Sequence, residues 1–84
     1  MSKKKVKIGE AVVVDARGIA KAVQLASHYE SALHIKARNM SANLKSIMGM
    51  MALELAKGEE ITLVAEGSDE EEALAGLQHY FAGV

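Results

Sequence analysis

A carboxylate and a guanidinium frame a predicted helix start in the stretch VDARGIAKAV, residues 14–23. Asp15 has the position of a helix N-cap, where its carboxylate can accept hydrogen bonds from the free N–H groups of the first turn. Arg17 lies two residues further along and can pair with that carboxylate. Because helix N-termini also attract anions, the stretch suits either a plain capped helix or a site for a negatively charged group.

A serine has a similar position in NLKSIMGMMAL, residues 43–53. Ser46 follows a predicted strand and opens a predicted short helix, so its hydroxyl can cap that helix. A phosphate on Ser46 would meet the free N–H groups of the helix start, with Lys45 adjacent in the sequence. The simpler alternative is an unmodified N-cap serine, which is common in proteins.

The helix after Ser46 carries more large apolar side chains than it can bury. Ile47, Met48, Met50 and Met51 follow one another so closely that they cannot all face a sheet. Met48 and Met51 share one face at i, i+3 spacing. We expect part of this surface to be exposed and available for docking, because methionine adapts to many partners. An overfilled small core is the alternative.

No other residue pattern predicts a metal, a cofactor or catalysis. The chain has no cysteine, which excludes disulfides, zinc–thiolate sites and thiol nucleophiles. The electrostatics of a helix start account for the acidic run 69–72. Three histidines lack partners at metal or catalytic spacing, and we interpret them as surface or helix-end residues: His28, His34 and His79. We therefore predict a protein that is not an enzyme and that has no metal and no cofactor.

Length and charge indicate one small domain over residues 1–84. The chain has ten basic and eleven acidic side chains, for a formal net charge of −1. No net field attracts nucleic acid or an anionic membrane, no apolar stretch approaches a membrane span, and no signal peptide is recognisable. A small domain without disulfides suits a reducing cytoplasm. We therefore predict a cytoplasmic protein without direct nucleic-acid or membrane contacts.

Changes in hydrophobic period place these residues on strands and helices. Alternation of apolar and polar residues predicts strands, and helical spacing predicts helices. The predicted strands are 4–9, 33–38, 40–44 and 61–67, and the predicted helices are 15–29, 46–53 and 68–81. A tight turn at residues 38–39 joins the second and third strands, since Asn39 tolerates positive φ.

The last helix has the clearest start. The run SDEE, residues 68–71, predicts a capping box in which Ser68 caps the helix and Glu71 reaches back. Each strand has one apolar and one polar face, which predicts an α+β fold with one mostly antiparallel sheet covered by helices on one side. Helical spacing predicts the buried stripe of the last helix: Ala73, Leu74, Leu77 and Phe81.

The segment LKSIMGMMALELAKGEEITLVAEG resembles the regulatory-serine region of the HPr family, the phosphocarrier proteins of the bacterial sugar phosphotransferase system. The resemblance extends over nearly the whole chain, including SDEEEAL at the last helix. It implies the HPr-like open-faced β-sandwich, a four-stranded antiparallel sheet covered on one face by three helices in the order βαββαβα. The residues that fit the serine motif are Lys45, Ser46, Ile47, Met48, Gly49, Met51 and Leu53.

The chain departs from the family at the phosphorylatable histidine. The family carries GIHARPA before its first helix, and the matching stretch here is VVDARGI. Ala16 and Arg17 fit this motif. Asp15 stands at the histidine position, and Gly18 replaces the proline. The resemblance thus implies an anion-binding frame without its nucleophile, as in Crh-type paralogues, which lack the histidine and keep the serine.

This pattern implies regulation instead of phosphate transport. Ser46 would be phosphorylated by the bifunctional HPr kinase/phosphorylase, and the phosphoprotein would bind a LacI-type regulator, catabolite control protein A, as its corepressor in carbon catabolite repression. Ile47, Met48 and Met51 would form the apolar contact with that regulator. The rest of the partner surface would come from Asp15, Arg17, Ala20, Lys21 and Lys45. We expect a monomer or a weak dimer.

Two other functions remain open from the residues. Asp15 could form an acyl phosphate, as a carrier or phosphotransfer intermediate of the phosphotransferase system, although this chemistry needs an activating site. The domain could instead be a binding module that uses the HPr fold without any phosphorylation.

Overall fold

Seven elements form the structure, a computed structural model that describes residues 1–83. The strands are β1 (Ser2–Lys7), β2 (Ala32–Ala37), β3 (Met40–Asn43) and β4 (Glu60–Glu66). The helices are α1 (Ala16–Ala26), α2 (Ile47–Ala52) and α3 (Glu70–Ala82). The predicted order βαββαβα is confirmed, and the largest shift of a helix end is in α1, which ends at Ala26 instead of residue 29.

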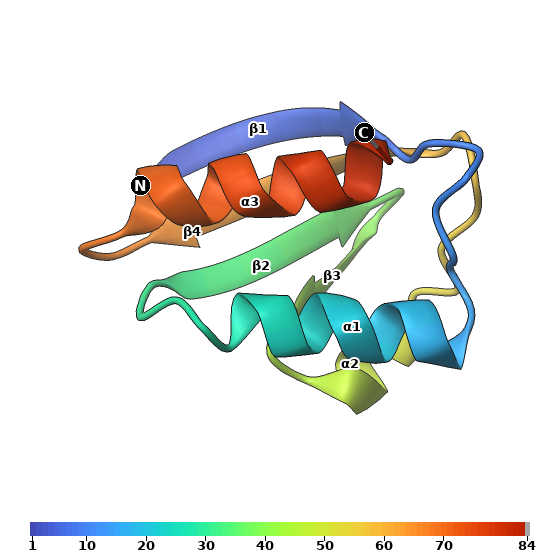
Figure 1. Ribbon diagram of the computed structural model, residues 1–84, viewed down its shortest axis with the longest axis horizontal. Coiled ribbons are helices and arrows are strands. Elements are labelled where there is room, and N and C mark those ends of the chain that lie inside the picture. The colour runs from blue at the N-terminus through green and yellow to red at the C-terminus, as the bar shows by residue number, and fades with distance from the viewer. Residues whose placement is uncertain (84) are drawn as a thin grey trace.

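The four strands make one antiparallel sheet in the order β1-β4-β2-β3. Helices α1 and α3 lie side by side across one face of this sheet, and α2 lies next to α1 and β3 (Figure 1). The opposite face carries exposed polar side chains, among them Lys5, Lys7 and Lys36. This arrangement confirms the predicted open-faced α+β sandwich.

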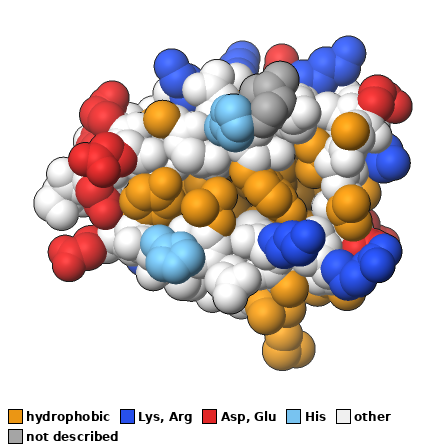
Figure 2. All heavy atoms as spheres, viewed as in Figure 1, with side chains coloured by type: hydrophobic (Ala, Val, Ile, Leu, Met, Phe, Trp, Pro, Cys, Tyr) orange, Lys and Arg blue, Asp and Glu red, His pale blue; other side chains and the backbone are white. Residues whose placement is uncertain are grey.

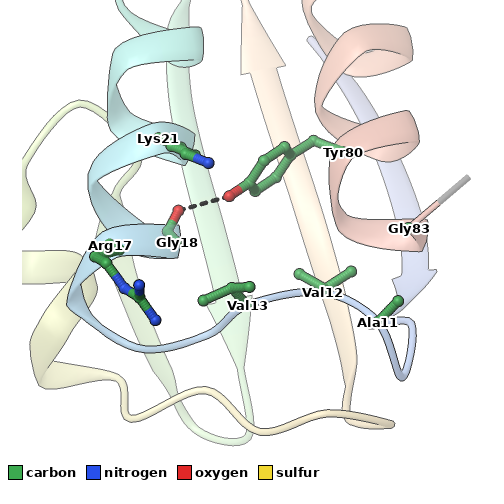
Figure 3. Close-up of a pocket in the computed structure, with 8 residues that line it drawn as sticks. All are labelled: Ala11, Val12, Val13, Arg17, Gly18, Lys21, Tyr80 and Gly83. Atoms are coloured by element: carbon green, nitrogen blue, oxygen red, sulfur yellow. Dashed lines mark hydrogen bonds between the residues drawn. The ribbon is translucent and has the colours of Figure 1, made fainter.

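The inner face of the sheet and the two long helices form the core. Ile35 and Leu63 face each other across β2 and β4, and both are fully buried. The predicted stripe of α3 is confirmed, because all of its residues are buried: Ala73, Leu74, Leu77 and Phe81. Burial of these side chains fixes α1 and α3 on the sheet, so that the start of α1 faces the end of α3 (Figure 3).

The predicted capping box of the last helix is wrong. Helix α3 begins at Glu70 rather than just after Ser68, and no side chain among residues 1–83 caps it. The carboxylate that reaches back belongs to Glu70 instead of Glu71, and it accepts a hydrogen bond from the Gly67 N–H at 3.1 Å. A single hydrogen bond between Gly67 and Glu70 therefore replaces the two bonds predicted between Ser68 and Glu71.

A long-range contact of Asp69 explains this shift. Its carboxylate accepts hydrogen bonds from the backbone N–H groups of Glu30 at 2.9 Å and Ser31 at 3.0 Å, and from the Ser31 hydroxyl. These bonds, led by the Ser31 hydroxyl, lower the pKa of the Asp69 carboxyl. Asp69 therefore ties the loop before β2 to the start of α3, which a local sequence pattern cannot reveal.

The turn between β2 and β3 also differs from the prediction in one residue. Arg38, and not Asn39, adopts positive φ, at 58°. Its guanidinium donates hydrogen bonds to the Glu59 carboxylate and to the Leu53 carbonyl oxygen. These contacts hold Arg38 in a conformation that asparagine adopts more readily, and they join the turn to the end of α2.

Candidate functional site

The start of α1 is organised around Asp15. Its carboxylate accepts hydrogen bonds from the N–H groups of Arg17 at 3.0 Å and Gly18 at 3.3 Å, which confirms Asp15 as the N-cap. The Arg17 guanidinium donates to the other carboxylate oxygen at 3.4 Å. The Gly18 N–H bond, and then the contacts with Arg17, lower the pKa of the Asp15 carboxyl. Asp15 is therefore a charged cap whose acceptor oxygens are already engaged.

Gly18 is required by close packing at this helix start. A Cβ at Gly18 would lie 1.7 Å from the carbonyl oxygen of Val13, so the loop before α1 runs closer than any other side chain allows. The Tyr80 hydroxyl of α3 donates a hydrogen bond to the Gly18 carbonyl at 2.7 Å (Figure 3). Burial raises the pKa of Tyr80, which keeps this donor protonated. The start of α1 is thus connected to α3.

A recess of about 470 Å³ opens between the first turns of α1, the loop before it and the end of α3 (Figure 3). Its apolar wall includes Val12 and Val13, and α3 contributes Tyr80. Arg17 and Lys21, two residues of the predicted partner surface, supply positive charge from α1. Such a recess suits an apolar group accompanied by negative charge. Sequence reasoning missed Tyr80 because its place here depends on how α3 packs.

Ser46 caps α2, as predicted. Its hydroxyl oxygen accepts a hydrogen bond from the Gly49 N–H at 3.1 Å, and its backbone is extended, with φ −112° and ψ 114°. The side chain is half-buried. A Cβ at Gly49 would lie 3.3 Å from this hydroxyl oxygen, so the glycine leaves the serine room.

The large side chains of α2 divide between core and solvent. Met50 is fully buried, at 0% exposure, and fixes the helix to the core. Met48 is 85% exposed, and Ile47 and Met51 are also exposed. The prediction that part of this surface is exposed is confirmed. We call Ile47, Met48 and Met51 the α2 surface.

Hydrophobic side chains reach the molecular surface on the side where the helices lie. Figure 2 shows a band of them between α1 and α3, and further hydrophobic atoms that project where α2 lies. The predicted contacts Arg17, Ala20 and Lys21 on α1 are all exposed. Because α1 and α2 pack against each other, the fold brings the two groups of predicted partner residues onto neighbouring helices.

The ammonium group of Lys45 is bound to the backbone, whereas the sequence placed it beside a phosphate on Ser46. Its ammonium donates a hydrogen bond to the carbonyl oxygen of Tyr29, at 2.7 Å, in the turn that follows α1. Its own backbone N–H donates to the Asn43 side chain at 2.8 Å. Lys45 therefore connects the turn after α1 with the loop just before α2.

Within residues 1–83, no cluster of three histidine, aspartate or glutamate side chains could hold a metal ion. All three histidines are exposed: His28, His34 and His79. None of the helices in the described part of the chain is long and apolar enough to cross a membrane.

Comparison with known proteins gives a consistent match. The family described as "PTS HPr component phosphorylation site" matches residues 2–83. The HPr-like protein Crh of Bacillus subtilis is 39% identical over 80 residues, which cover 95% of this chain and 94% of that protein.

Solved structures agree with this match. The phosphocarrier protein HPr from Bacillus anthracis superposes with a TM-score of 0.90 at 38% identity, covering 95% of each chain. A crystal structure of Crh from Bacillus subtilis, described as a dimer with a swapped domain, has a TM-score of 0.78 at 38% identity, covering 93% of this chain and 85% of that one.

Proposed function

The chain belongs to the HPr family, and from that premise we propose that it is a regulatory member, controlled by phosphorylation of Ser46, and not a histidine phosphocarrier. HPr and Crh proteins are phosphocarriers or regulators, and are not enzymes. They act in the phosphotransferase system or in catabolite repression. The proposal assigns this chain to the second role.

The observation that carries the proposal is the engagement of Asp15. The family's histidine offers a ring nitrogen to the incoming phosphoryl group, whereas Asp15 offers carboxylate oxygens that already accept bonds from Arg17 and Gly18. Phosphorylation of this carboxylate would turn one of its acceptor oxygens into the bridge to phosphorus and so disturb the hydrogen bonds that cap α1. An acyl phosphate also needs an activating site. These two requirements disfavour the rival function of an acyl-phosphate intermediate.

The environment of Ser46 supports its role as the modified residue. The residue is half-buried, and a phosphate on it would lie against the first turn of α2. It would add about −1.5 to −2 charges beside the exposed α2 surface. Charge and apolar area together would then mark the phosphorylated state for a partner.

The proposed partners are the HPr kinase/phosphorylase and a LacI-type regulator. The phosphoprotein acts as corepressor of that regulator in carbon catabolite repression, and the α2 surface makes the apolar contact. Asp15, Arg17, Ala20 and Lys21 extend the contact along α1, and the recess beside Arg17 receives a partner side chain. Such a protein works in the cytoplasm. Relatives include a dimeric Crh, and for this chain we propose a monomer or a weak dimer.

A binding experiment tests the proposal. The protein is phosphorylated with HPr kinase/phosphorylase and ATP, and its affinity for the LacI-type regulator is measured by titration calorimetry. Ser46→Ala removes the acceptor, and Ser41→Ala is a matched control on an exposed serine of β3. We expect tight binding that requires kinase treatment and is lost only in Ser46→Ala. Equal binding with and without kinase treatment would instead favour a module that works without phosphorylation.

A further inference from the structure

The methionines of this chain differ sharply in their access to solvent. The chain has five methionines and no cysteine, so thioethers are the side chains that mild oxidants attack most readily. Their exposed fractions are Met48 85%, Met1 72%, Met40 46%, Met51 43% and Met50 0%. The most exposed thioether therefore lies two residues after Ser46, at the centre of the α2 surface.

Resting on the proposed function, we propose that Met48 is an oxidation site through which hydrogen peroxide weakens docking of the α2 surface. The Met48 sulfur attacks one peroxide oxygen, the O–O bond breaks, and the other oxygen leaves as water after proton transfer. The sulfur loses two electrons and becomes a sulfoxide, and the peroxide is reduced. Thiol-dependent sulfoxide reductases reduce this sulfoxide back to methionine, so the modification is reversible and can serve regulation.

Oxidation of Met48 changes the surface without disturbing the fold. The side chain projects into solvent, so a sulfoxide there creates no buried polar group in the free protein. Met50 provides the contrast within the same helix, because its sulfur is enclosed by the core and shielded from peroxide. A sulfoxide pressed into a partner interface would leave a polar oxygen without water, which weakens association about five- to a hundredfold.

The first part of the test is chemical and does not depend on any partner. The purified full chain is treated with dilute hydrogen peroxide, catalase ends the reaction, and peptide mass mapping follows each methionine. We expect Met48 to oxidise ahead of Met40 and Met51, and Met50 to stay reduced while far-ultraviolet circular dichroism is unchanged. Oxidation of Met50 at the rate of Met48 would overturn the assignment.

The second part measures docking through the kinase. The specificity constant kcat/KM for phosphorylation of Ser46 by HPr kinase/phosphorylase is compared before and after oxidation, and again after methionine sulfoxide reductase treatment. Met48→Leu keeps an apolar side chain without a thioether, and Met51→Leu is the matched control. We expect at least a fivefold loss in the wild type and in Met51→Leu, restored by the reductase, and no loss in Met48→Leu.

Two results contradict this inference in different ways. An unchanged rate after Met48 oxidation, or an equal loss in Met48→Leu, overturns Met48 as the switch. Failure of the untreated wild type to be phosphorylated at all overturns the proposed function, and with it the regulatory step, while the order of oxidation still tests the site.

Discussion

Truncation of two methionines in one short helix gives a direct measure of how α2 is anchored. Met50→Ala removes a side chain that is fully buried, and Met48→Ala removes the same atoms from a position that is 85% exposed. The two variants change the intrinsic helix propensity of α2 by the same amount, so this contribution cancels when they are compared. What remains is the difference between core and solvent.

The expected magnitudes are well separated. A buried methionine truncated to alanine costs about 2–5 kcal/mol in the free energy of unfolding, whereas a surface substitution stays within about 0.5 kcal/mol. In a domain of this size each kcal/mol shifts Tm by about 4–8 °C, so Met50→Ala should lower Tm by at least about 8 °C. Met48→Ala should shift it by at most about 4 °C.

Thermal and urea unfolding followed by far-ultraviolet circular dichroism measure both quantities. Agreement between the two methods checks that unfolding is two-state. The reasoning is refuted if Met48→Ala destabilises the protein as much as Met50→Ala does. Met48 would then belong to the core, and the α2 surface would not be free to bind a partner.

Three further predictions concern the caps and the loop packing. Ser46→Ala should lower the free energy of unfolding by about 0.5–2 kcal/mol in denaturant melts, and Ser46→Asp should restore most of it, because both serine and aspartate cap helices; no loss in the alanine variant would exclude Ser46 as a cap. Gly18→Ala should cost about 1–3 kcal/mol, because the new Cβ must displace the Val13 carbonyl, and a wild-type melting curve would contradict this. The Asp69 carboxyl has a lower pKa in the folded protein than in the unfolded chain, so the unfolded chain binds more protons in acid. The stability that Asp69 contributes is therefore present above the ordinary pKa of 3.8 and is lost as the pH falls through the lower folded pKa. In melts from about pH 6 down to about pH 2, the free energy of unfolding should therefore fall less steeply with pH in Asp69→Asn than in the wild type. An equally steep fall in both proteins would count against the link between Asp69 and the loop before β2.

Local patterns predicted the features whose causes lie within a few residues. Asp15 and Ser46 were found as caps because a cap depends on the N–H groups two or three positions ahead. The buried stripe of α3 followed from helical spacing alone. Exposure on α2 followed from simple geometry, because so short a helix cannot turn every large side chain inward.

Features that depend on contacts between distant segments could not be predicted. Asp69 bonds to backbone groups nearly forty residues away, and the capping box that the sequence predicted between Ser68 and Glu71 does not form. Lys45 reaches the carbonyl of Tyr29, and Tyr80 reaches that of Gly18, only because the sheet brings these elements together. The recess beside Arg17 has the same origin, since α3 supplies one of its walls.

Site-resolved phosphorylation tests the central claim most directly. The protein is incubated in parallel with HPr kinase/phosphorylase plus ATP, and with phosphoenolpyruvate plus the general phosphotransferase enzyme, and intact-mass spectrometry at neutral pH is followed by peptide mapping. A regulatory protein should gain one phosphoryl group on Ser46 in the first reaction and none in the second. A stoichiometric phosphoryl group from phosphoenolpyruvate, carried on Asp15 and released by hydroxylamine, would contradict the account.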